Sequence, residues 1–581
     1  MTTASGEKPP RPMNPSRHQL PQKVSPDRQR ARADTRRIEQ ERFELTREDP
    51  SPYEDLARLP PYVKVLPADV KFPLAYQARL GIAKLEQKAK AKAVSVLTVL
   101  RRFDKQDDYH ALYRLLGGDA ENVGQWRLDA EFGRMRLDGV NPMAIQRLLD
   151  RAPTELWEAA RRVLSVAGRS IDALFGEKKL YFVEYSDLWH ASVQDEVRKA
   201  KPRKGRPVRL AAPTCLFWEH GGQLLPLAIQ LKPAGVEEPN PVVTPLHKPA
   251  DWQMARAHVA AADAHVHEGY YHLLETHLVN EAVALCMYRQ LHPDHPVRQL
   301  LTPHYQGTMA INDTARHNLL MVDPPGPIQK AMAAGVTGTL NAARLRYRRW
   351  SFTERALDRD LEARGVEDLP NYHYRDDARA IHAALTRFVR AFLGLWYRDG
   401  GDVTGDYELA QFLGEVASPV GGDVPGFPAK VRTPEELFDL VTHLIFRAGP
   451  QHAAVNNGQF DTYGEAANGP GRLHGELPDE IHEGQAHYRE ADFWKALPTR
   501  EAAVAQMCMV WVLSLPTQSS ILHTGQFPDF DPALSFQAVE AIAALRRRLQ
   551  AISYQIQERN SGLTVPYRYL DPQNVSRSTD V

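Results

Sequence analysis

The sequence predicts a mainly α-helical fold, with one large helical domain, a small β-hairpin or sheet region, and a long central helix interrupted by a π-bulge. Three observations support this class. After Pro60, long segments carry apolar residues at three- and four-residue spacing. Only two short stretches have the apolar, β-branched and aromatic character of strands. No Gly/Ser linker and no repeat of 20–50 residues divides the chain.

The composition is that of an ordinary globular protein, with 43% apolar and 25% charged residues. Lys+Arg and Asp+Glu both number 72, so no overall field favours nucleic acid, and we expect no nucleic-acid partner. Three widely spaced cysteines argue against a disulfide framework or a cysteine-based zinc site. Nothing in the sequence points to a protein partner.

Residues 1–55 form a Pro/Arg-rich arm without a strong apolar pattern, and we expect this arm to be disordered. A solvated tail is the simplest interpretation, although the arginines between 28 and 37 also allow a weak contact with a membrane surface. The arm has no apolar run of a signal peptide. The longest apolar stretch, 502–516, is a buried helix too short to span a bilayer. We therefore expect a cytoplasmic protein.

The remaining chain, 56–581, is predicted to be one catalytic domain in which 56–110 form a helical cover and Phe72 to Phe103 is the first long helix. Strands are expected at LYFVEY (180–185) and as a hairpin around His-Gly-Gly within 215–231. The later helices are expected at 252–291, 375–397, 434–446 and 536–556.

A capping box is predicted at the start of the 434–446 helix, where Thr433 can cap the amide of Glu436 and Pro434 needs no amide partner. Gly449-Pro450 follows this helix. We therefore expect it to break, kink or restart just before His452.

Histidines are concentrated between 258 and 304, far above their average density in the chain. Imidazoles without cysteine and with few flanking carboxylates favour a site for a first-row metal. Several of these histidines are instead core or surface residues, an interpretation we prefer for His258, His265 and His292. Five remain as a spaced set: His267, His272, His277, His295 and His304.

His272 and His277 are five residues apart, which on a regular α-helix turns them about 140° away from one another. An inserted π-turn would bring them onto one face, so the spacing predicts a π-bulge between them. His452 and Asn456 are four apart and share a face without distortion. Neutral ligands leave a metal ion under-neutralised, so a carboxylate is expected from elsewhere; spacing alone does not identify it.

At these residues the chain resembles the lipoxygenases, the non-haem iron dioxygenases of polyunsaturated fatty acids. The five-histidine spacing of that family is present from His267 to His304, and its second motif is present as HAAVN…GQ from His452 to Gln459. Further similarity is found in WRLDAEFGRMRLDGVNPMAIQRL (126–148), YHYRDDARAIHAAL (372–385) and the carboxy-terminal segment 558–581. The chain looks most like the shorter bacterial members that lack an amino-terminal β-barrel domain.

The resemblance implies one iron per chain, with manganese less favoured, and it implies the ligands. These correspond to His272, His277, His452, Asn456 and the terminal carboxylate of Val581, which stands where the family usually has isoleucine. Glu268 and Gln459 fall on positions that support the ligands. His267, His295 and His304 match the motif without being ligands, and we expect them to be structural hydrogen-bonding residues.

The resemblance also implies the reaction. A ferric hydroxide takes hydrogen from the methylene between two cis double bonds, O2 adds to the pentadienyl radical, and no side-chain base is required. Ala315 stands where the family carries Ala or Gly, and Ala there implies S hydroperoxides. Ala264 corresponds to a position on the pocket floor that is often bulky, which implies a deep cavity.

Three alternatives remain open from the sequence. The same fold can use manganese or act mainly as a hydroperoxide isomerase, because the ligands alone fix neither the metal nor the balance of reactions. A non-catalytic lipid-binding protein could keep the fold. An unrelated zinc hydrolase would explain the histidine density, but it gives no account of the second motif.

Overall fold

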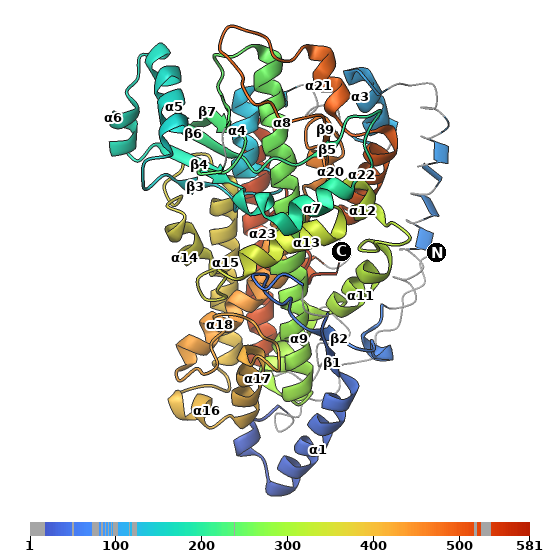
Figure 1. Ribbon diagram of the computed structural model, residues 1–581. Coiled ribbons are helices and arrows are strands. Elements are labelled where there is room, and N and C mark those ends of the chain that lie inside the picture. Colours follow the sequence, from blue (N-terminus) through green and yellow to red (C-terminus); the bar gives the residue numbers. More distant parts are fainter. Residues whose placement is uncertain are drawn as a thin grey trace, which may run out of the picture.

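A long buried helix forms the central column of the protein. The computed structural model describes residues 18–48, 52–72, 103–115, 117–118, 125–236, 239–515, 520–523 and 536–580, and parts of 81–96. The column consists of α8 (Pro249–Val266), the π-helix η4 (His267–Leu278) and α9 (Val279–Gln290), which follow one another without a break (Figure 1). Almost every residue of the column is buried, because other helices pack around it on all sides. The long central helix and its π-helical turn confirm the prediction.

Further helices surround the column. They are α1 (Pro26–Arg42), α3 (Gln106–Leu115), α4 (Asp129–Asp138), α5 (Thr154–Val166), α6 (Ile171–Gly176), α7 (Ala191–Lys199), α10 (Pro296–Tyr305), α11 (Thr308–Asn318), α12 (Pro327–Ala331), α13 (Gly335–Tyr347), α14 (Leu357–Ala363), α15 (His373–Leu393), α16 (Gly400–Thr404), α17 (Tyr407–Ala417), α18 (Pro434–Phe446), the π-helix η5 (Arg447–Gln451), α19 (His452–Asn456), α20 (Gln459–Tyr463), α21 (Glu490–Ala496), α22 (Arg500–Leu513) and α23 (Phe536–Ser561). Short 3-10 turns are η1 (Pro21–Lys23), η2 (Ala68–Val70), η3 (Ser186–Trp189) and η6 (Ile521–His523). The helices predicted at 375–397, 434–446 and 536–556 are confirmed as α15, α18 and α23.

The strands lie mainly in one small antiparallel sheet beside the column. Its order is β3-β4-β6-β7-β8, and the pairs β1-β2 and β5-β9 are separate. The strands are β1 (Leu45–Thr46), β2 (Tyr62–Val63), β3 (Gln146–Arg147), β4 (Leu180–Glu184), β5 (Val208–Arg209), β6 (Thr214–His220), β7 (Gln223–Gln230), β8 (Val242–Val243) and β9 (Leu473–His474). β6 and β7 form the predicted hairpin. Its turn residues Gly221 and Gly222 have φ of 59° and 82°, which glycine adopts at little cost.

Other elements pack on both faces of this sheet. Successive side chains of a strand point to opposite faces, so the residues of β6 belong alternately to two clusters. On β6, Cys215 and Phe217 belong to the main core. Leu216 and Trp218 belong to a separate cluster with apolar residues of α5 and α6. The sheet therefore joins the helical body to the α5–α6 layer, which projects at the upper left of Figure 1.

The segment before His452 is where the sequence expectation was least definite. The capping box at the start of α18 is confirmed, since Thr433 Oγ1 accepts from the Glu436 amide at 3.2 Å and Glu436 accepts from the Thr433 amide at 3.4 Å. At its other end α18 neither stops nor restarts. It passes through the π-helix η5, which contains Pro450, and continues as α19. The π-turn accommodates a proline that has no amide to donate.

The amino-terminal arm is the clearest correction to the sequence analysis. The expectation of disorder over residues 1–55 is wrong for the segment that forms α1. Arg32 of α1 makes two hydrogen bonds, at 2.8 and 2.9 Å, to Glu408 of α17, and both side chains are buried. Glu39 receives a 2.9 Å hydrogen bond from Arg298 of α10. Buried ion pairs hold this helix, and a composition argument based on apolar content does not anticipate them.

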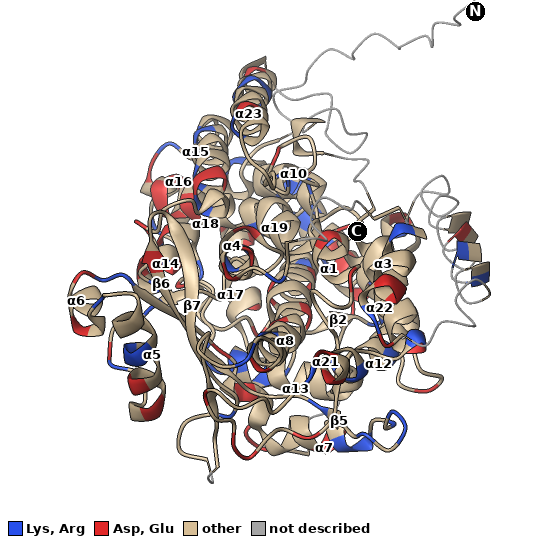
Figure 2. Ribbon diagram, turned by 90° about the horizontal axis from the view of Figure 1, so that it is seen from above, with Lys and Arg blue, Asp and Glu red and all other residues tan. Residues whose placement is uncertain are grey.

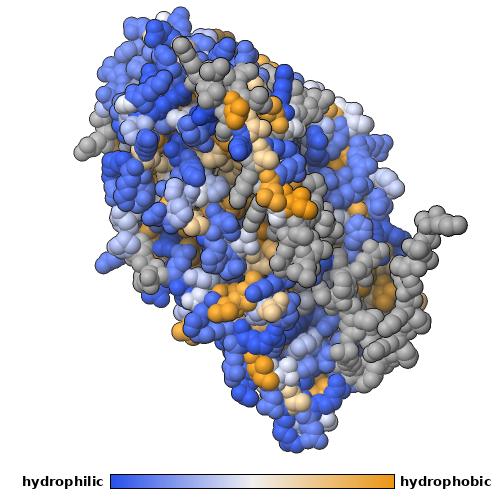
Figure 3. Space-filling model, turned by 90° about the vertical axis from the view of Figure 1, so that its right-hand side faces the viewer, coloured by the Kyte–Doolittle hydropathy of each residue, from blue (hydrophilic) through white to orange (hydrophobic). Residues whose placement is uncertain are grey.

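The predicted helix from Phe72 to Phe103 lies largely outside the described residues, so the expected helical cover over 56–110 remains an expectation. Basic and acidic residues are interspersed over the molecule (Figure 2). Within the described residues, no helix combines the length and the apolar character that crossing a bilayer requires. On the face seen in Figure 3, hydrophobic side chains form small, separate groups among hydrophilic ones.

Candidate metal centre

The π-helix η4 places two of the predicted ligands on the same side of the central column. All twelve residues from His267 to Leu278 are in this segment, so each turn contains more residues than an α-turn. His272 and His277, five positions apart, then approach one another with ring centroids 4.9 Å apart. The π-insertion predicted from their spacing is confirmed.

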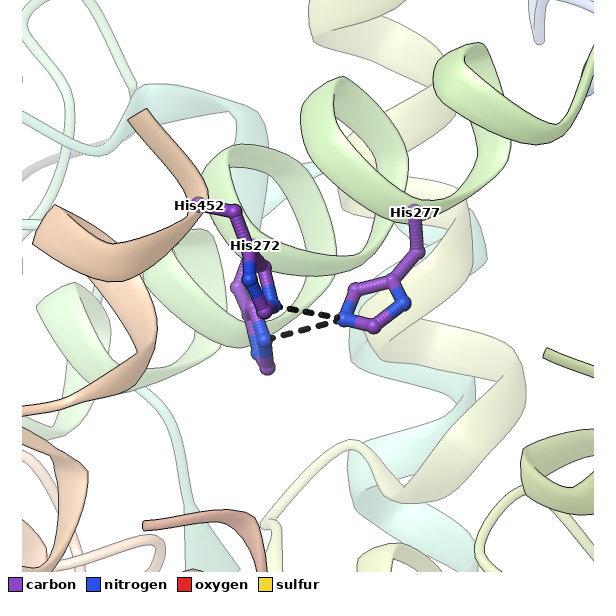
Figure 4. A group of neighbouring side chains, drawn as sticks. All are labelled: His272, His277 and His452. Atoms are coloured by element: carbon purple, nitrogen blue, oxygen red, sulfur yellow. Dashed lines mark hydrogen bonds between the residues drawn. The ribbon is translucent and has the colours of Figure 1, made fainter. Parts of the chain in front are cut away.

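The third histidine comes from a different helix and meets the first two. The Nε2 atom of His277 lies 3.2 Å from Nε2 of His272 and 3.2 Å from Nε2 of His452 (Figure 4). Figure 4 shows the three rings converging on one point between the column and α19. One ligand atom from each histidine lies within 4.8 Å of those of the other two, and all three side chains are buried.

Burial keeps these three imidazoles neutral. Desolvation lowers the pKa of His272 to about 4, and desolvation together with the nearby His272 lowers the pKa of His277 to about 3. The pKa of His452 is also well below its usual value, for the same causes. Nδ1 of His277 donates to Oδ1 of Asn312 at 2.8 Å, which leaves its Nε2 with a free lone pair. Lone pairs that face one another at 3.2 Å fit a bound cation between them.

Asn456 and Gln459 lie next to this cluster. Asn456 is fully buried, one helical turn after His452, and interacts with the imidazole of His272. Its Nδ2 donates to the carbonyl of Leu513 at 2.9 Å, and its Oδ1 accepts from Gln459 Nε2 at 2.8 Å. The amide is therefore oriented from both ends, and its oxygen retains capacity for a further partner.

Glu268 lies on the other side of His272. Its Oε2 is 3.4 Å from Nδ1 of His272, and burial raises the pKa of the Glu268 carboxyl. The two groups are one helical turn apart in η4. Glu268 is thus placed to orient the ring of His272.

The carboxy-terminal segment is threaded into the interior beside the histidines, and residues 575–580 are buried. Thr579 Oγ1 donates to the carbonyl of Ala448 in η5 at 3.1 Å and accepts from Asn280 of α9 at 3.0 Å. A side chain at Gly449 would lie 2.7 Å from the carbonyl oxygen of Ser576, so glycine permits this close approach. Val581 itself lies outside the described residues, and its role remains a prediction.

The other three histidines of the first motif hold the surrounding structure together. Nε2 of His267 is 2.7 Å from the carbonyl of Val455, which joins the column to α19. His295 caps α10 and lies 3.0 Å from Asp406. Nδ1 of His304 is 2.9 Å from the carbonyl of Arg577 in the carboxy-terminal segment. Each makes a structural hydrogen bond, as the sequence analysis expected.

Sequence reasoning missed Asn312. Besides holding His277, its Nδ2 donates to the His277 carbonyl at 3.0 Å and to Glu281 at 2.7 Å. Glu281 in turn forms a double hydrogen bond with Arg316, at 2.9 and 3.0 Å. The sequence did contain a signal for Asn312. It precedes Ala315 and Arg316 by three and four residues, a spacing that puts all three on one face of a helix.

Glu275 was also missed, although it lies within η4 between the two histidines. Its carboxylate accepts from Trp350 at 3.0 Å, from Arg355 at 2.9 Å and from Gln451 of η5 at 3.2 Å. Arg447, the fully buried first residue of η5, donates to the Glu275 carbonyl. This buried network joins η4, which contains His272 and His277, to η5, which ends directly before His452.

The two predicted pocket residues are in different environments. Ala264 of α8 is buried in an apolar cluster with residues of several helices, among them Val140, Val336, Met509 and Val510. Ala315 is half-buried on α11, one turn after Asn312. The structure therefore places a small side chain at each position.

Comparison with known proteins decides the family. A family model described as Lipoxygenase matches residues 74–572, which is most of the chain. The chain belongs to the lipoxygenase family.

Similar lipoxygenases include the polyunsaturated fatty acid lipoxygenases ALOX8 of Mus musculus, 33% identical, and ALOX15B of Rattus norvegicus, 31% identical. The matches cover 78% and 87% of this chain and 66% and 72% of those proteins. The hydroperoxide isomerase ALOXE3 of Rattus norvegicus is 32% identical, over 78% of this chain and 62% of the relative. The chain thus spans about two thirds of the length of these relatives.

Solved lipoxygenase structures have the same fold. The crystal structure of coral 8R-lipoxygenase has a TM-score of 0.85 and 27% identity, covering 97% of this chain and 83% of that one. A lipoxygenase crystallised anaerobically in complex with arachidonate has a TM-score of 0.86 and 26% identity, with the same coverage. The mainly helical lipoxygenase fold expected from the sequence is therefore confirmed.

Proposed function

We propose that this lipoxygenase is an iron-dependent enzyme that oxygenates polyunsaturated fatty acids containing a cis,cis-1,4-pentadiene unit. The observation that carries the proposal is the convergence of three buried, neutral histidines. Nε2 of His277 lies 3.2 Å from Nε2 of His272 and 3.2 Å from Nε2 of His452. The product would be a conjugated hydroperoxide. Similarity to proteins named polyunsaturated fatty acid lipoxygenases, and to a structure that contains arachidonate, supports the substrate class.

The residues that would hold the metal are His272, His277, His452, Asn456 and the carboxylate of Val581. A set of nitrogen and oxygen donors with one anion suits a divalent or trivalent first-row metal. When bound, iron supplies the one-electron redox chemistry needed to take a hydrogen atom from a methylene flanked by two double bonds. Manganese would be compatible with the same donors and is the less favoured ion.

The protein's own groups orient the ligands and shape the cavity. Asn312 holds the tautomer of His277, Glu268 lies beside His272, and Gln459 orients Asn456. Such partners fix ligand geometry and commonly change metal affinity about 10–100-fold when they are removed. The apolar cluster around Ala264 would exclude water from the fatty-acid chain.

The position and stereochemistry of oxygenation are the finer part of the proposal. Ala315 lies one turn beyond Asn312, on the helix that contacts His277. A methyl group at this position would direct O2 to the end of the pentadiene that gives S products. Ala264 would leave the cavity deep.

A second candidate function is hydroperoxide isomerisation on the same scaffold. It is favoured by one observation, that hydroperoxide isomerases of rat and human are each 32% identical to this chain, close to the identity of the dioxygenases. The two functions differ in their net use of oxygen, since an isomerase rearranges a hydroperoxide without consuming O2. A non-catalytic lipid-binding role would use neither reactant.

The decisive experiment measures oxygen uptake and conjugated-diene absorbance together, with linoleic and arachidonic acids and untagged protein of known iron content. We expect one O2 to disappear for each hydroperoxide formed. Turnover of added hydroperoxide without oxygen uptake would favour the isomerase. Iron-loaded protein that changes neither compound would refute both and leave lipid binding.

A further inference from the structure

A pocket lies between α14, α15 and α18. These three helices are neighbours on the left of Figure 1. The pocket has a volume of about 1020 Å³, at the upper end of the range of roughly 300–1,000 Å³ usual for small-molecule sites. None of the proposed metal-centre residues lines it. The pocket is thus a candidate site separate from the catalytic one.

Its exposed rim carries an excess of positive charge. Arg387 of α15, and Lys430 and Arg432 just before α18, line the pocket and are exposed. Within the described part of the chain these three side chains make no ion pair. Two further lining arginines are only loosely paired, Arg359 with Glu354 and Arg390 with Asp439, both at 3.5 Å.

The lining carboxylates offset this charge only in part, because there are three of them, Asp358, Glu436 and Asp439, against five lining cations, Arg359, Arg387, Arg390, Lys430 and Arg432. Asp358 accepts from Arg379 at 2.9 Å, outside the pocket. Glu436 is used by the capping box of α18 and accepts from the Arg432 and Thr433 amides. Asp439 pairs with Arg390. The rim therefore keeps a net positive charge, which can attract an anion.

The inner wall is apolar. It includes Phe352, Leu357 and Leu440, all buried, and the half-buried Val431. A small inorganic anion would contact the rim and leave this wall unused. Charge at one edge and apolar surface behind it instead complement an amphiphile with an anionic head and a hydrocarbon chain.

Polar side chains interrupt this wall: the half-buried Thr353, His382 and Thr386, and the buried His443. His443 lines the pocket and is buried, with its Nε2 donating to the carbonyl of Phe352 at 3.2 Å. Its Nδ1 has no hydrogen-bond partner among the described residues. In the neutral ring this nitrogen is an acceptor, which favours a ligand that can offer a hydroxyl donor.

We propose that the pocket between α14, α15 and α18 binds a long-chain carboxylate, with its head on Arg387, Lys430 and Arg432 and its chain along Phe352, Leu357 and Leu440. The two sources of this chemistry are an unmodified fatty acid and its oxygenated derivative. The site does not take part in the oxygenation reaction and is a second lipid site on the enzyme.

The test uses a saturated fatty acid with a photoreactive tail, which has no pentadiene and cannot be turned over. After irradiation of the full-length protein, labelled peptides are mapped by mass spectrometry. We expect labelling of peptides 352–359 and 430–443. Unlabelled oleate and an unlabelled hydroxy fatty acid are added as competitors. The one that reduces labelling of these peptides more at equal concentration shows whether the pocket prefers the unmodified or the oxygenated fatty acid.

Two variants and one matched control make the test specific. Labelling of these peptides should fall about tenfold in Arg387→Glu/Lys430→Glu/Arg432→Glu, since three attractive charges become repulsive. Val431→Trp, which fills the wall without changing charge, should also reduce it. The control Arg169→Glu/Lys201→Glu/Lys204→Glu makes the same change of charge at exposed positions outside the pocket and should label like the wild type.

The proposal fails if these peptides stay unlabelled while others react, or if the rim variant labels as strongly as the wild type. It also fails if a photoreactive alcohol of equal chain length labels the pocket as well as the acid does. Because labelling needs no turnover, these outcomes are independent of whether the protein oxygenates fatty acids.

Discussion

Asn312 and His277 are joined twice: the Asn312 side chain accepts from Nδ1 of the imidazole at 2.8 Å and donates to the backbone carbonyl of the same histidine at 3.0 Å. One amide therefore fixes both the tautomer of the ring and the π-helical turn that presents it. Because Asn312 comes from α11, the geometry of the histidine cluster depends on a helix that contributes no ligand.

Replacing Asn312 by alanine should weaken metal binding. The imidazole of His277 would lose its tautomer partner, and we expect iron affinity to fall about 10–100-fold. Competition with a chelator measures this without any assay of turnover. Asn318→Ala is the matched control, since Asn318 lies at the end of the same helix, is exposed and bonds only to the Thr314 carbonyl among described residues. Equal affinities of the two variants would contradict the role of Asn312.

Removing Val581 should have a larger effect than changing its side chain. We expect deletion to withdraw the only proposed anionic ligand, so that purified protein retains little iron. Val581→Ile keeps a terminal carboxylate and a β-branched side chain and should retain it. Elemental analysis of both proteins gives the answer, and full iron content after deletion would exclude Val581 as a ligand.

Glu275→Ala should destabilise the protein strongly. The variant removes a fully buried carboxylate that pairs with Arg355 and bonds to Trp350 and Gln451. Breaking a buried pair by removing one partner costs about 3–5 kcal/mol. Glu275→Gln keeps hydrogen-bonding capacity and should lose less. Denaturant unfolding compares the two, and similar losses would show that the charge of Glu275 is unimportant.

Glu465 should make the stability of the protein depend on pH. It is buried, with its carboxylate 3.9 Å from Nε2 of His110, and burial raises its pKa from 4.5 to about 8 against a smaller lowering by the Ala467 amide. The folded state therefore keeps a proton that the unfolded state loses. The protonated Glu465 carboxyl therefore contributes to the stability of the fold. This contribution is complete below pH 4.5 and is lost as the pH rises to about 8, at roughly 1.4 kcal/mol per pH unit.

Glu465→Gln removes this titration. The stability of the variant relative to the wild type should rise between pH 5 and 8 and change little above that range. Thermal unfolding at several pH values measures the difference, with the exposed Glu540→Gln as control. A constant difference across the range would mean that Glu465 is ionised in the folded protein.

Ala315→Gly should alter the stereochemistry of the product if the proposed oxygenation is correct. Loss of the methyl group would open the other end of the pentadiene to O2, and we expect a mixture containing R hydroperoxide in place of a predominantly S product. Chiral chromatography distinguishes them. The change also costs about 1 kcal/mol of helix stability, so the product ratio is the informative quantity rather than the rate.

The parts of the fold that depend on local pattern could be predicted from the sequence. The five-residue spacing of His272 and His277 predicted the π-insertion, and Thr433 and Glu436 predicted the start of α18 within one residue. The glycine pair predicted the hairpin turn. In each case the signal and the structure lie within a few neighbouring residues.

The parts that were missed depend on partners far away in the chain. Asn312 meets a histidine 35 positions earlier, and Gln451 meets Glu275 across 176 positions. Composition made the arm look disordered because the partner of Arg32, Glu408, is 376 positions away. A single sequence does not indicate which distant polar residues pair with one another. Apolar periodicity predicts which face of a helix is buried, but it does not identify the residues against which that face packs.

The docking of α1 sets the boundary of the unit that can fold independently. A fragment of residues 74–581, which starts where the match to the lipoxygenase family model begins, would leave Glu408 and Arg298 without the charges that α1 supplies. Uncompensated buried charge is costly, so such a fragment should be poorly stable even though every proposed metal ligand is present. Expression trials, crystallisation and fusions should therefore keep the chain from Leu20 onward intact.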